Sequence, residues 1–263
     1  MSTETLLVET DGRGVCRVTM NRADLHNAFD DGLIARLTGT FTTLSTDPAV
    51  RVVVLQGAGK SFSAGADLNW MKRMVAYTRD ENFADALGLA RMLHAIHSCA
   101  KPVIARVHGP AFGGGVGLVA ACDIAIAGPK ASFCLSEVKL GLIPAAISPY
   151  VVQALGARAC RRYFQSAERF DAQEAHRLGL VHEVTDEESF DGAVEAMITT
   201  LLANGPRAMA AAKSLIDAVT DQPVTDALLQ ETAGRIADIR VSDEGQEGLG
   251  AFLEKRKAAW VEG

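Results

Sequence analysis

Two segments rich in small residues constrain the fold of this chain more than any other feature. One is Ser63–Asp67, and the other is Gly109–Gly117, in which five of the nine residues are glycine. Each segment follows an apolar run typical of a β-strand, Val52–Leu55 or Val103–Val107, and each leads into a stretch of helical character. Repeated strand–turn–helix units predict an α/β fold whose mostly parallel sheet is covered by helices.

The same two segments indicate a candidate site. Each would place free backbone N–H groups at the start of a helix, where no bulky side chain covers them. Two such groups that point to one place would bind an oxygen atom that becomes negatively charged during a reaction. A site built from backbone amides suits the enolate of a thioester.

The remaining pattern predicts an α/β core over residues 1–195 and a helical C-terminal region over residues 196–263. In the core we expect a hairpin of Leu6–Val8 and Val15–Met20, helices over Phe29–Leu44, Leu68–Tyr77, Glu81–Ser98 and Gly115–Ala121, and a strand over Asp123–Ala127. From about Tyr150 the pattern is almost wholly helical. Its helix signals are an Asp171–Glu174 cap, an apolar stripe over Phe190–Leu202, a start at Gly205-Pro206, and Ser242 as cap of a last helix to Lys257.

Composition excludes several classes of protein. The chain has 263 residues, of which 48% are hydrophobic and 22% charged, as in a globular enzyme. Its net charge of −6 argues against nucleic acid as a partner. The five cysteines form no CxxC pair, so we expect no metal site. No apolar run is long enough to span a membrane, and residues 1–12 do not resemble a signal peptide, so we expect a cytoplasmic protein.

The glycines of the second segment have two other interpretations. They can serve close packing between a helix and a strand. In addition, Gly115-Val-Gly117-Leu-Val-Ala120 matches the dinucleotide fingerprint GxGxxA, with Glu137 about twenty residues further on. That fingerprint requires a tight turn after the strand, whereas seven residues separate Val107 from Gly115. The match is therefore weak, and it leaves Ser63–Asp67 unexplained.

Glu137 is the candidate acid. It lies in Phe133–Pro144, an almost wholly apolar stretch, where partial burial would raise the pKa of its carboxyl and allow proton transfer in both directions. A salt bridge to Lys139 or simple exposure would account for Glu137 equally well. Asp67 likewise has an ordinary interpretation as the N-cap of the following helix.

In this order along the chain, these segments resemble the crotonase (enoyl-CoA hydratase/isomerase) superfamily. The resemblance covers essentially the whole chain, and the motifs that carry it are Asn21-Arg22, Asn27–Phe29, Phe62–Asp67, Lys101–Ala105, Ala111–Gly115, Ala121–Asp123, Ala175–Val181, Glu247-Gly248 and Phe252–Arg256. It implies a spiral of ββα turns with a helical C-terminal region that builds trimers, often paired into hexamers. It also implies an acyl-CoA substrate, so that CoA enters with the substrate and no separate cofactor is expected.

The resemblance assigns roles to particular residues. It implies that the backbone amides of Ala66 and Gly114 form the oxyanion hole and that Glu137 is the catalytic acid. The residues that it implies for binding CoA and the acyl group are Asp24, Leu25, His26, Ala64, Gly65, Asp67, Gly113 and Gly117, together with Phe252 and Lys255 for the nucleotide end of CoA.

One departure bears on the reaction. Two-carboxylate hydratases of this superfamily have a glutamate where this chain has Gly117. A single acid is also the pattern of Δ3,Δ2-enoyl-CoA isomerases. The Phe133–Tyr150 segment, however, most resembles bacterial methylglutaconyl-CoA hydratase-type proteins, so we favour a hydratase, with the isomerase as the alternative. An acyl-CoA or RNA binder without catalytic activity would leave the oxyanion hole and the acid without a purpose.

Overall fold

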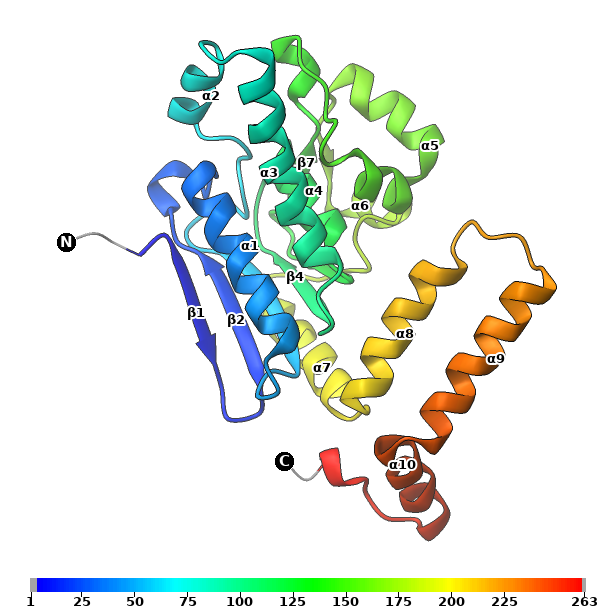
Figure 1. Ribbon diagram of the computed structural model, residues 1–263. Coiled ribbons are helices and arrows are strands. Elements are labelled where there is room, and N and C mark those ends of the chain that lie inside the picture. Colours follow the sequence, from blue (N-terminus) through cyan, green and yellow to red (C-terminus); the bar gives the residue numbers. More distant parts are fainter. Residues whose placement is uncertain (1–3, 262–263) are drawn as a thin grey trace.

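In the computed structural model, which describes residues 4–261, a six-stranded sheet forms the centre of the α/β part (Figure 1). The first pair of strands is antiparallel and every other neighbouring pair is parallel. In spatial order the strands are β1 (Leu6–Thr10), β2 (Val15–Met20), β3 (Val52–Gly57), β4 (Val103–Val107), β6 (Ile124–Ala127) and β9 (Glu183–Val184). The expected hairpin and the mostly parallel sheet are confirmed.

The central strands β3 and β4 are buried on both faces of this sheet, because helices cover both faces. Along β3, Val53 and Leu55 face the main core, whereas Val52 and Val54 pack in a second cluster with α7 (Phe190–Leu202). The helices of the first half and of the main core are α1 (Asp31–Thr46), α2 (Leu68–Met74), α3 (Arg79–His97), α4 (Gly114–Ala121), α5 (Ser148–Ser166) and α6 (Ala172–Leu178). Of these, α1 and α3 lie side by side (Figure 1).

A second, small sheet holds the segment between β4 and α4. Its strands are β5 (Ala111–Phe112), β7 (Ser132–Cys134) and β8 (Phe170–Asp171). β5 runs parallel to β7, and β7 runs antiparallel to β8. Phe133 of β7 lies directly opposite Phe170 of β8, and their stacked rings, with centroids 5.5 Å apart, join these two strands.

Helix ends differ from the expected ones where capping decides them. α1 begins after Phe29 because the Asp30 side chain accepts the Leu33 N–H as an N-cap. α2 ends at Met74, three residues before the expected Tyr77. The last long helix, α10 (Asp243–Glu254), ends before the expected Lys257 because Lys255 adopts a left-handed conformation with φ 55°. The expected caps at Asp171 and Ser242 are confirmed.

The C-terminal helices extend away from the sheet (Figure 1). They are α8 (Pro206–Val219), α9 (Asp226–Val241) and α10, followed by the short 3-10 helix η3 (Ala259–Val261). Residue 196, the expected start of this region, lies within α7, whose buried side chains pack on the sheet. α8 is fixed to the core by an ion pair of 2.8 Å between Lys213 and Asp123.

Arg51 holds the base of this helical region. Its guanidinium donates hydrogen bonds to the carbonyl oxygens of Leu202, Asn204 and Trp260. Because these three carbonyls belong to the end of α7, the loop before α8 and the C-terminal segment, one cation fixes where the helical region leaves the core.

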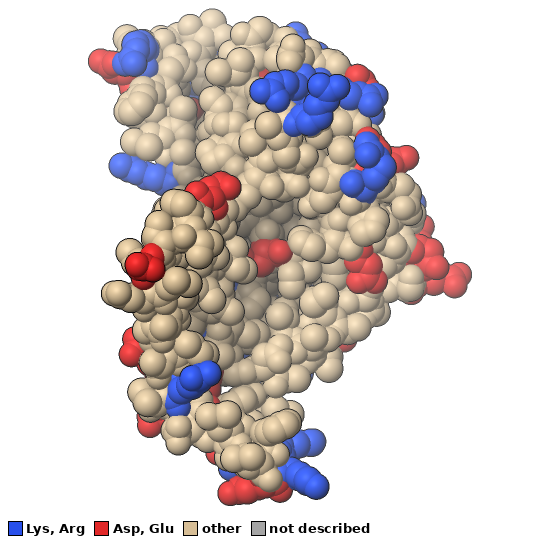
Figure 2. Space-filling view, turned by 90° about the vertical axis from the view of Figure 1, so that its right-hand side faces the viewer, with Lys and Arg blue, Asp and Glu red and all other residues tan. Residues whose placement is uncertain are grey.

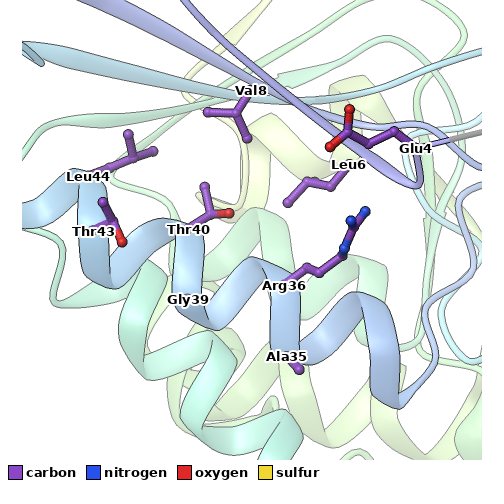
Figure 3. Close-up of a pocket in the computed structure, with 9 residues that line it drawn as sticks. All are labelled: Glu4, Leu6, Val8, Ala35, Arg36, Gly39, Thr40, Thr43 and Leu44. Atoms are coloured by element: carbon purple, nitrogen blue, oxygen red, sulfur yellow. The ribbon is translucent and has the colours of Figure 1, made fainter.

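Within residues 4–261, none of the helices combines the length and the hydropathy that a membrane-spanning segment requires. A groove lies between β1 and α1, with Leu6 and Val8 on one side and Arg36, Thr40 and Leu44 on the other (Figure 3). No residue predicted for the candidate site lines this groove.

Candidate active site

The two small-residue segments lie against each other, as their sequences predict. Ser63 forms an isolated parallel bridge with Ala111, and its carbonyl oxygen accepts the Phe112 N–H at 2.9 Å. A methyl group on Gly65 would lie 2.7 Å from the Phe112 oxygen and 3.5 Å from the Gly114 nitrogen. For the second segment, the interpretation of its glycines as packing residues is supported at Gly115, because a methyl group there would lie 2.5 Å from the Ser63 oxygen.

Hydrogen bonding leaves free the two N–H groups that are expected to form the oxyanion hole. Phe29 donates its N–H to the Gly65 oxygen at 2.8 Å and accepts the Asp67 N–H at 3.0 Å. This parallel bridge turns the intervening Ala66 N–H away from Phe29, and it has no partner within residues 4–261. Gly114 is the first residue of α4, and its N–H also has none in that part of the chain.

Glu137 lies beside the start of α4. It begins the 3-10 helix η2 (Glu137–Leu140), and its Oε1 lies 3.2 Å from the position that a methyl group on Gly113 would take. Its Oε2 is buried and has no hydrogen-bond partner among the described residues. Burial raises the pKa of the Glu137 carboxyl above its ordinary value. The alternative of a salt bridge to Lys139 is wrong, because within residues 4–261 the structure contains no such pair and Lys139 is exposed.

Gly117 does not leave open space. One turn after Gly114 on α4, a methyl group on Gly117 would lie 2.2 Å from Cγ2 of Ile147 and 3.6 Å from Cδ2 of Leu93. The absence of a side chain at Gly117 therefore does not leave room for a water molecule or a bulkier acyl group at this position. The branched side chain of Ile147 fills it.

The segment predicted to bind CoA lies beside the first small-residue segment. Asp24 and Leu25 belong to the 3-10 helix η1 (Ala23–Leu25), and His26 follows it in a left-handed conformation. The His26 oxygen accepts the Ala64 N–H at 2.9 Å, and the His26 Nδ1 lies 3.0 Å from the Ser61 hydroxyl. The structure thus brings Asp24–His26 next to Ala64–Asp67.

Phe252 and Lys255 lie elsewhere. They belong to the end of α10, at the opposite end of the molecule from α2 in Figure 1, and both are exposed. The structure does not bring them to Glu137 of the same chain. A contact between these residues and CoA bound at this site would have to come from another subunit.

Phe29 was missed as a site residue by reasoning from sequence. Its ring lies where a methyl group on Gly114 would be, 2.3 Å from that position at Cζ, and it also contacts the ring of Trp70. Its apolar character indicated burial, but it was assigned to the first turn of a helix. Only the parallel bridge to Ala66, 37 positions away, shows that Phe29 supports both free amides.

No grouping of three or more His, Cys, Asp or Glu side chains suited to a metal ion occurs in the part of the chain that the structure describes. The five cysteines are all buried and free. The site itself offers two backbone donors, one desolvated carboxyl and apolar walls.

Comparison with known proteins identifies the family that this chain resembles. The family model described as enoyl-CoA hydratase/isomerase matches residues 10–263. The crystal structure of an enoyl-CoA hydratase from Shewanella pealeana is 46% identical, covers 98% of this chain and 97% of its own, and has a TM-score of 0.94. An enoyl-CoA hydratase/isomerase from Marinobacter aquaeolei is 34% identical, covers 98% and 100%, and has a TM-score of 0.93. The mitochondrial enoyl-CoA hydratase of Pongo abelii is 32% identical over 97% of this chain and 87% of its own.

Asp67 supports the loop that carries the free Ala66 amide. Burial alone would raise the pKa of its carboxyl, but the N–H groups of Asn69 and Trp70 and the Arg22 guanidinium outweigh burial and lower the pKa. Arg22 lies 2.9 Å from the Asp67 carboxylate. The sequence interpretation of Asp67 as an N-cap is confirmed.

We expect Asp67→Ala to lower the free energy of unfolding by about 2 kcal/mol at pH 7, because it removes an N-cap and a charged hydrogen bond. Since the pKa of Asp67 is lowered by folding, its contribution is complete above the ordinary value of 3.8 and is lost as the pH falls further. Urea unfolding at pH 7 and pH 3 measures both effects. Asp31→Ala, which breaks an exposed pair with Arg73, is the matched control with little effect. Equal losses for Asp67→Ala at both pH values would contradict this account.

Proposed function

The chain belongs to the enoyl-CoA hydratase/isomerase family, and we propose that it is a hydratase that adds water across the C2–C3 double bond of a 2-enoyl-CoA. The observation that carries this proposal is the buried, unpartnered Oε2 of Glu137, whose carboxyl lies against Gly113, the residue before the free N–H of Gly114. A carboxyl oxygen without a protein partner is suited to hold a water molecule. The names of its relatives support the same reaction.

In this proposal the thioester oxygen accepts hydrogen bonds from the N–H groups of Ala66 and Gly114. Both donors are held by the backbone, so they need no reorganisation when negative charge develops on that oxygen. Their withdrawal of electron density makes C3 electrophilic and stabilises the enolate that forms after attack. One such donor contributes roughly 3–4 kcal/mol to the stabilisation of the transition state.

Glu137 then accepts one proton and returns it. Its carboxylate takes a proton from the water, whose oxygen forms the new bond to C3, while the electrons of the double bond move into the enolate. The protonated carboxyl next gives that proton to C2, which completes the addition and restores the carboxylate. Because burial raises the pKa of Glu137, acceptance and return of a proton lie closer in energy than for an exposed glutamate.

A second candidate function is Δ3,Δ2-enoyl-CoA isomerisation. It is favoured because the hydrocarbon side chain of Ile147 occupies the place that a side chain at position 117 would take. Glu137 is then the acid of this site. In that reaction Glu137 removes a proton from C2 of a 3-enoyl-CoA and delivers it to C4, with no water consumed. The same two amides would hold the dienolate oxygen.

The remaining assignments belong to the same proposal. CoA would lie along Asp24–His26 and the Ala64–Asp67 loop, and Phe252 and Lys255 of a neighbouring subunit would contact its nucleotide end. Assembly as a trimer or hexamer is supported by apolar side chains exposed on α8–α10, namely Leu215, Ile216, Leu229, Ile236, Leu249 and Leu253. The side of the molecule on which α8 and α9 lie is mostly uncharged and is hollowed near its middle (Figure 2). A methylglutaconyl-CoA-like substrate and a cytoplasmic location remain predictions.

Product analysis in ¹⁸O-labelled water distinguishes the two reactions. The purified protein is incubated separately with a 2-enoyl-CoA, such as 2-butenoyl-CoA or 3-methylglutaconyl-CoA, and with a 3-enoyl-CoA. The masses of the products are then measured by mass spectrometry. We expect uptake of one ¹⁸O into a 2-enoyl-CoA and slow conversion of the 3-enoyl-CoA. Rapid conversion of the 3-enoyl-CoA without ¹⁸O uptake in any 2-enoyl-CoA would establish the isomerase instead.

We expect Glu137→Gln to lower kcat by at least about 100-fold and to leave the affinity for a saturated acyl-CoA nearly unchanged. Because water activation requires the carboxylate, the kcat/KM of the wild type should fall as the pH falls through the raised pKa of Glu137. Stopped-flow assays over a pH series measure both effects. Lys139→Gln, two residues away and exposed, is the control. Turnover of Glu137→Gln within a few-fold of wild type would remove Glu137 from the mechanism.

A further inference from the structure

The segment from Glu137 to Ile147 is fixed to α4 at both of its ends. At one end, the Glu137 carboxyl lies against Gly113, and at the other the Ile147 side chain lies against Gly117. Between them, Leu140, Leu142 and Ile143 are exposed. The segment that supplies the acid therefore also supplies a hydrocarbon side chain to the same short helix.

Helix geometry shows where Ile147 lies relative to the free amide. Gly114 and Gly117 are three residues apart, so they share a face of α4 and are separated by about 4.5 Å along its axis. Side chains on a helix lean toward its N-terminus, so the place that a side chain at position 117 would occupy lies over the first turn. Ile147 fills that place, since its Cγ2 is 2.2 Å from the Cβ position of Gly117. It thus lies over the turn that begins with the Gly114 N–H.

The position of Ile147 is held firmly. It is only 2% exposed, and it is the residue immediately before α5, where its carbonyl oxygen accepts the Val151 N–H at 3.1 Å. Leu93 of α3 also lies close to the Cβ position of Gly117 on α4. A side chain fixed by the start of one helix and packed between two others forms a rigid wall, because cores rearrange only partly around a change in volume.

We propose that Ile147 is the residue that limits the substituents on the β-carbon of the acyl group. The inference rests on the proposed function, in which the thioester oxygen lies at the Gly114 N–H. From that oxygen, C2 and C3 extend toward Glu137, over the first turn of α4. Ile147 lies over the same turn, so a group attached to C3 meets a branched hydrocarbon. The substrate class is then a 2-enoyl-CoA whose C3 carries, toward this wall, hydrogen or a small apolar group such as methyl.

The test is the ratio of kcat/KM values for two substrates, measured in the wild type and two variants. We compare kcat/KM for 3-phenylpropenoyl-CoA with kcat/KM for 2-butenoyl-CoA, in the wild type, Ile147→Val and Ile147→Ala. A methylene in an apolar pocket changes discrimination by about 10-fold or more. We therefore expect the ratio to rise at least about tenfold in Ile147→Ala and by a smaller factor in Ile147→Val. Ile104→Ala is the matched control, since Ile104 is equally buried but packs in the cluster around α7.

A binding measurement separates this inference from the proposed reaction. Calorimetry gives the dissociation constants of the saturated analogues, 3-phenylpropanoyl-CoA and butanoyl-CoA, whatever reaction the protein catalyses. We expect Ile147→Ala to improve the relative affinity for the phenyl compound by about tenfold. If both ratios stay within twofold of wild type in folded Ile147→Ala, the inference is overturned, and should that variant not fold, the same criterion applies to Ile147→Val. If the wild type hydrates no 2-enoyl-CoA but the binding ratio shifts, the proposed reaction fails and the role of Ile147 stands.

Discussion

The close approach of two backbone segments determines the rest of this structure. A methyl group on Gly115 would lie 2.5 Å from the Ser63 oxygen, and one on Gly65 would lie 2.7 Å from the Phe112 oxygen. Contacts this short are available only to glycine, and they bring the start of α4 against the Ser63–Asp67 segment. The main sheet aligns β3 and β4 side by side, so the segments that follow these strands emerge at one edge. Two unpaired N–H groups and one buried carboxyl then meet there.

Burial of the Glu137 carboxyl next to these amides costs stability. A desolvated carboxyl whose Oε2 has no hydrogen-bond partner in residues 4–261 is destabilising unless the group is neutral or receives a ligand. The raised pKa of the Glu137 carboxyl results from the same desolvation. Structural stability alone does not explain such a group, whereas the proposed role in proton transfer does. Asp67, in contrast, is stabilised by its partners and maintains the loop rather than exchanging protons.

Much of this arrangement was predictable from local sequence. The alternation of strands, glycine segments and helices indicated the parallel sheet, whereas the apolar surroundings of Glu137 left its burial as one of several interpretations. The comparisons confirm the family that the motifs suggested. The missed features are contacts between distant positions, such as the Phe29 ring on Gly114 and the Ile147 side chain on Gly117. A missing side chain in the sequence suggests empty space, but whether another residue fills that space depends on tertiary packing, which local patterns do not encode.

The most direct measurement of the central claim is the carbonyl stretching frequency of a bound thioester. A saturated acyl-CoA labelled with ¹³C at the thioester carbon is bound to the protein, and its C=O band is isolated by infrared difference spectroscopy. If the amides of Ala66 and Gly114 both bind the oxygen, the band lies below its frequency in water. In Gly114→Pro, which lacks one donor and whose fold is checked by circular dichroism, the band should move back toward that value. A band at the frequency in water for the wild type would contradict the account.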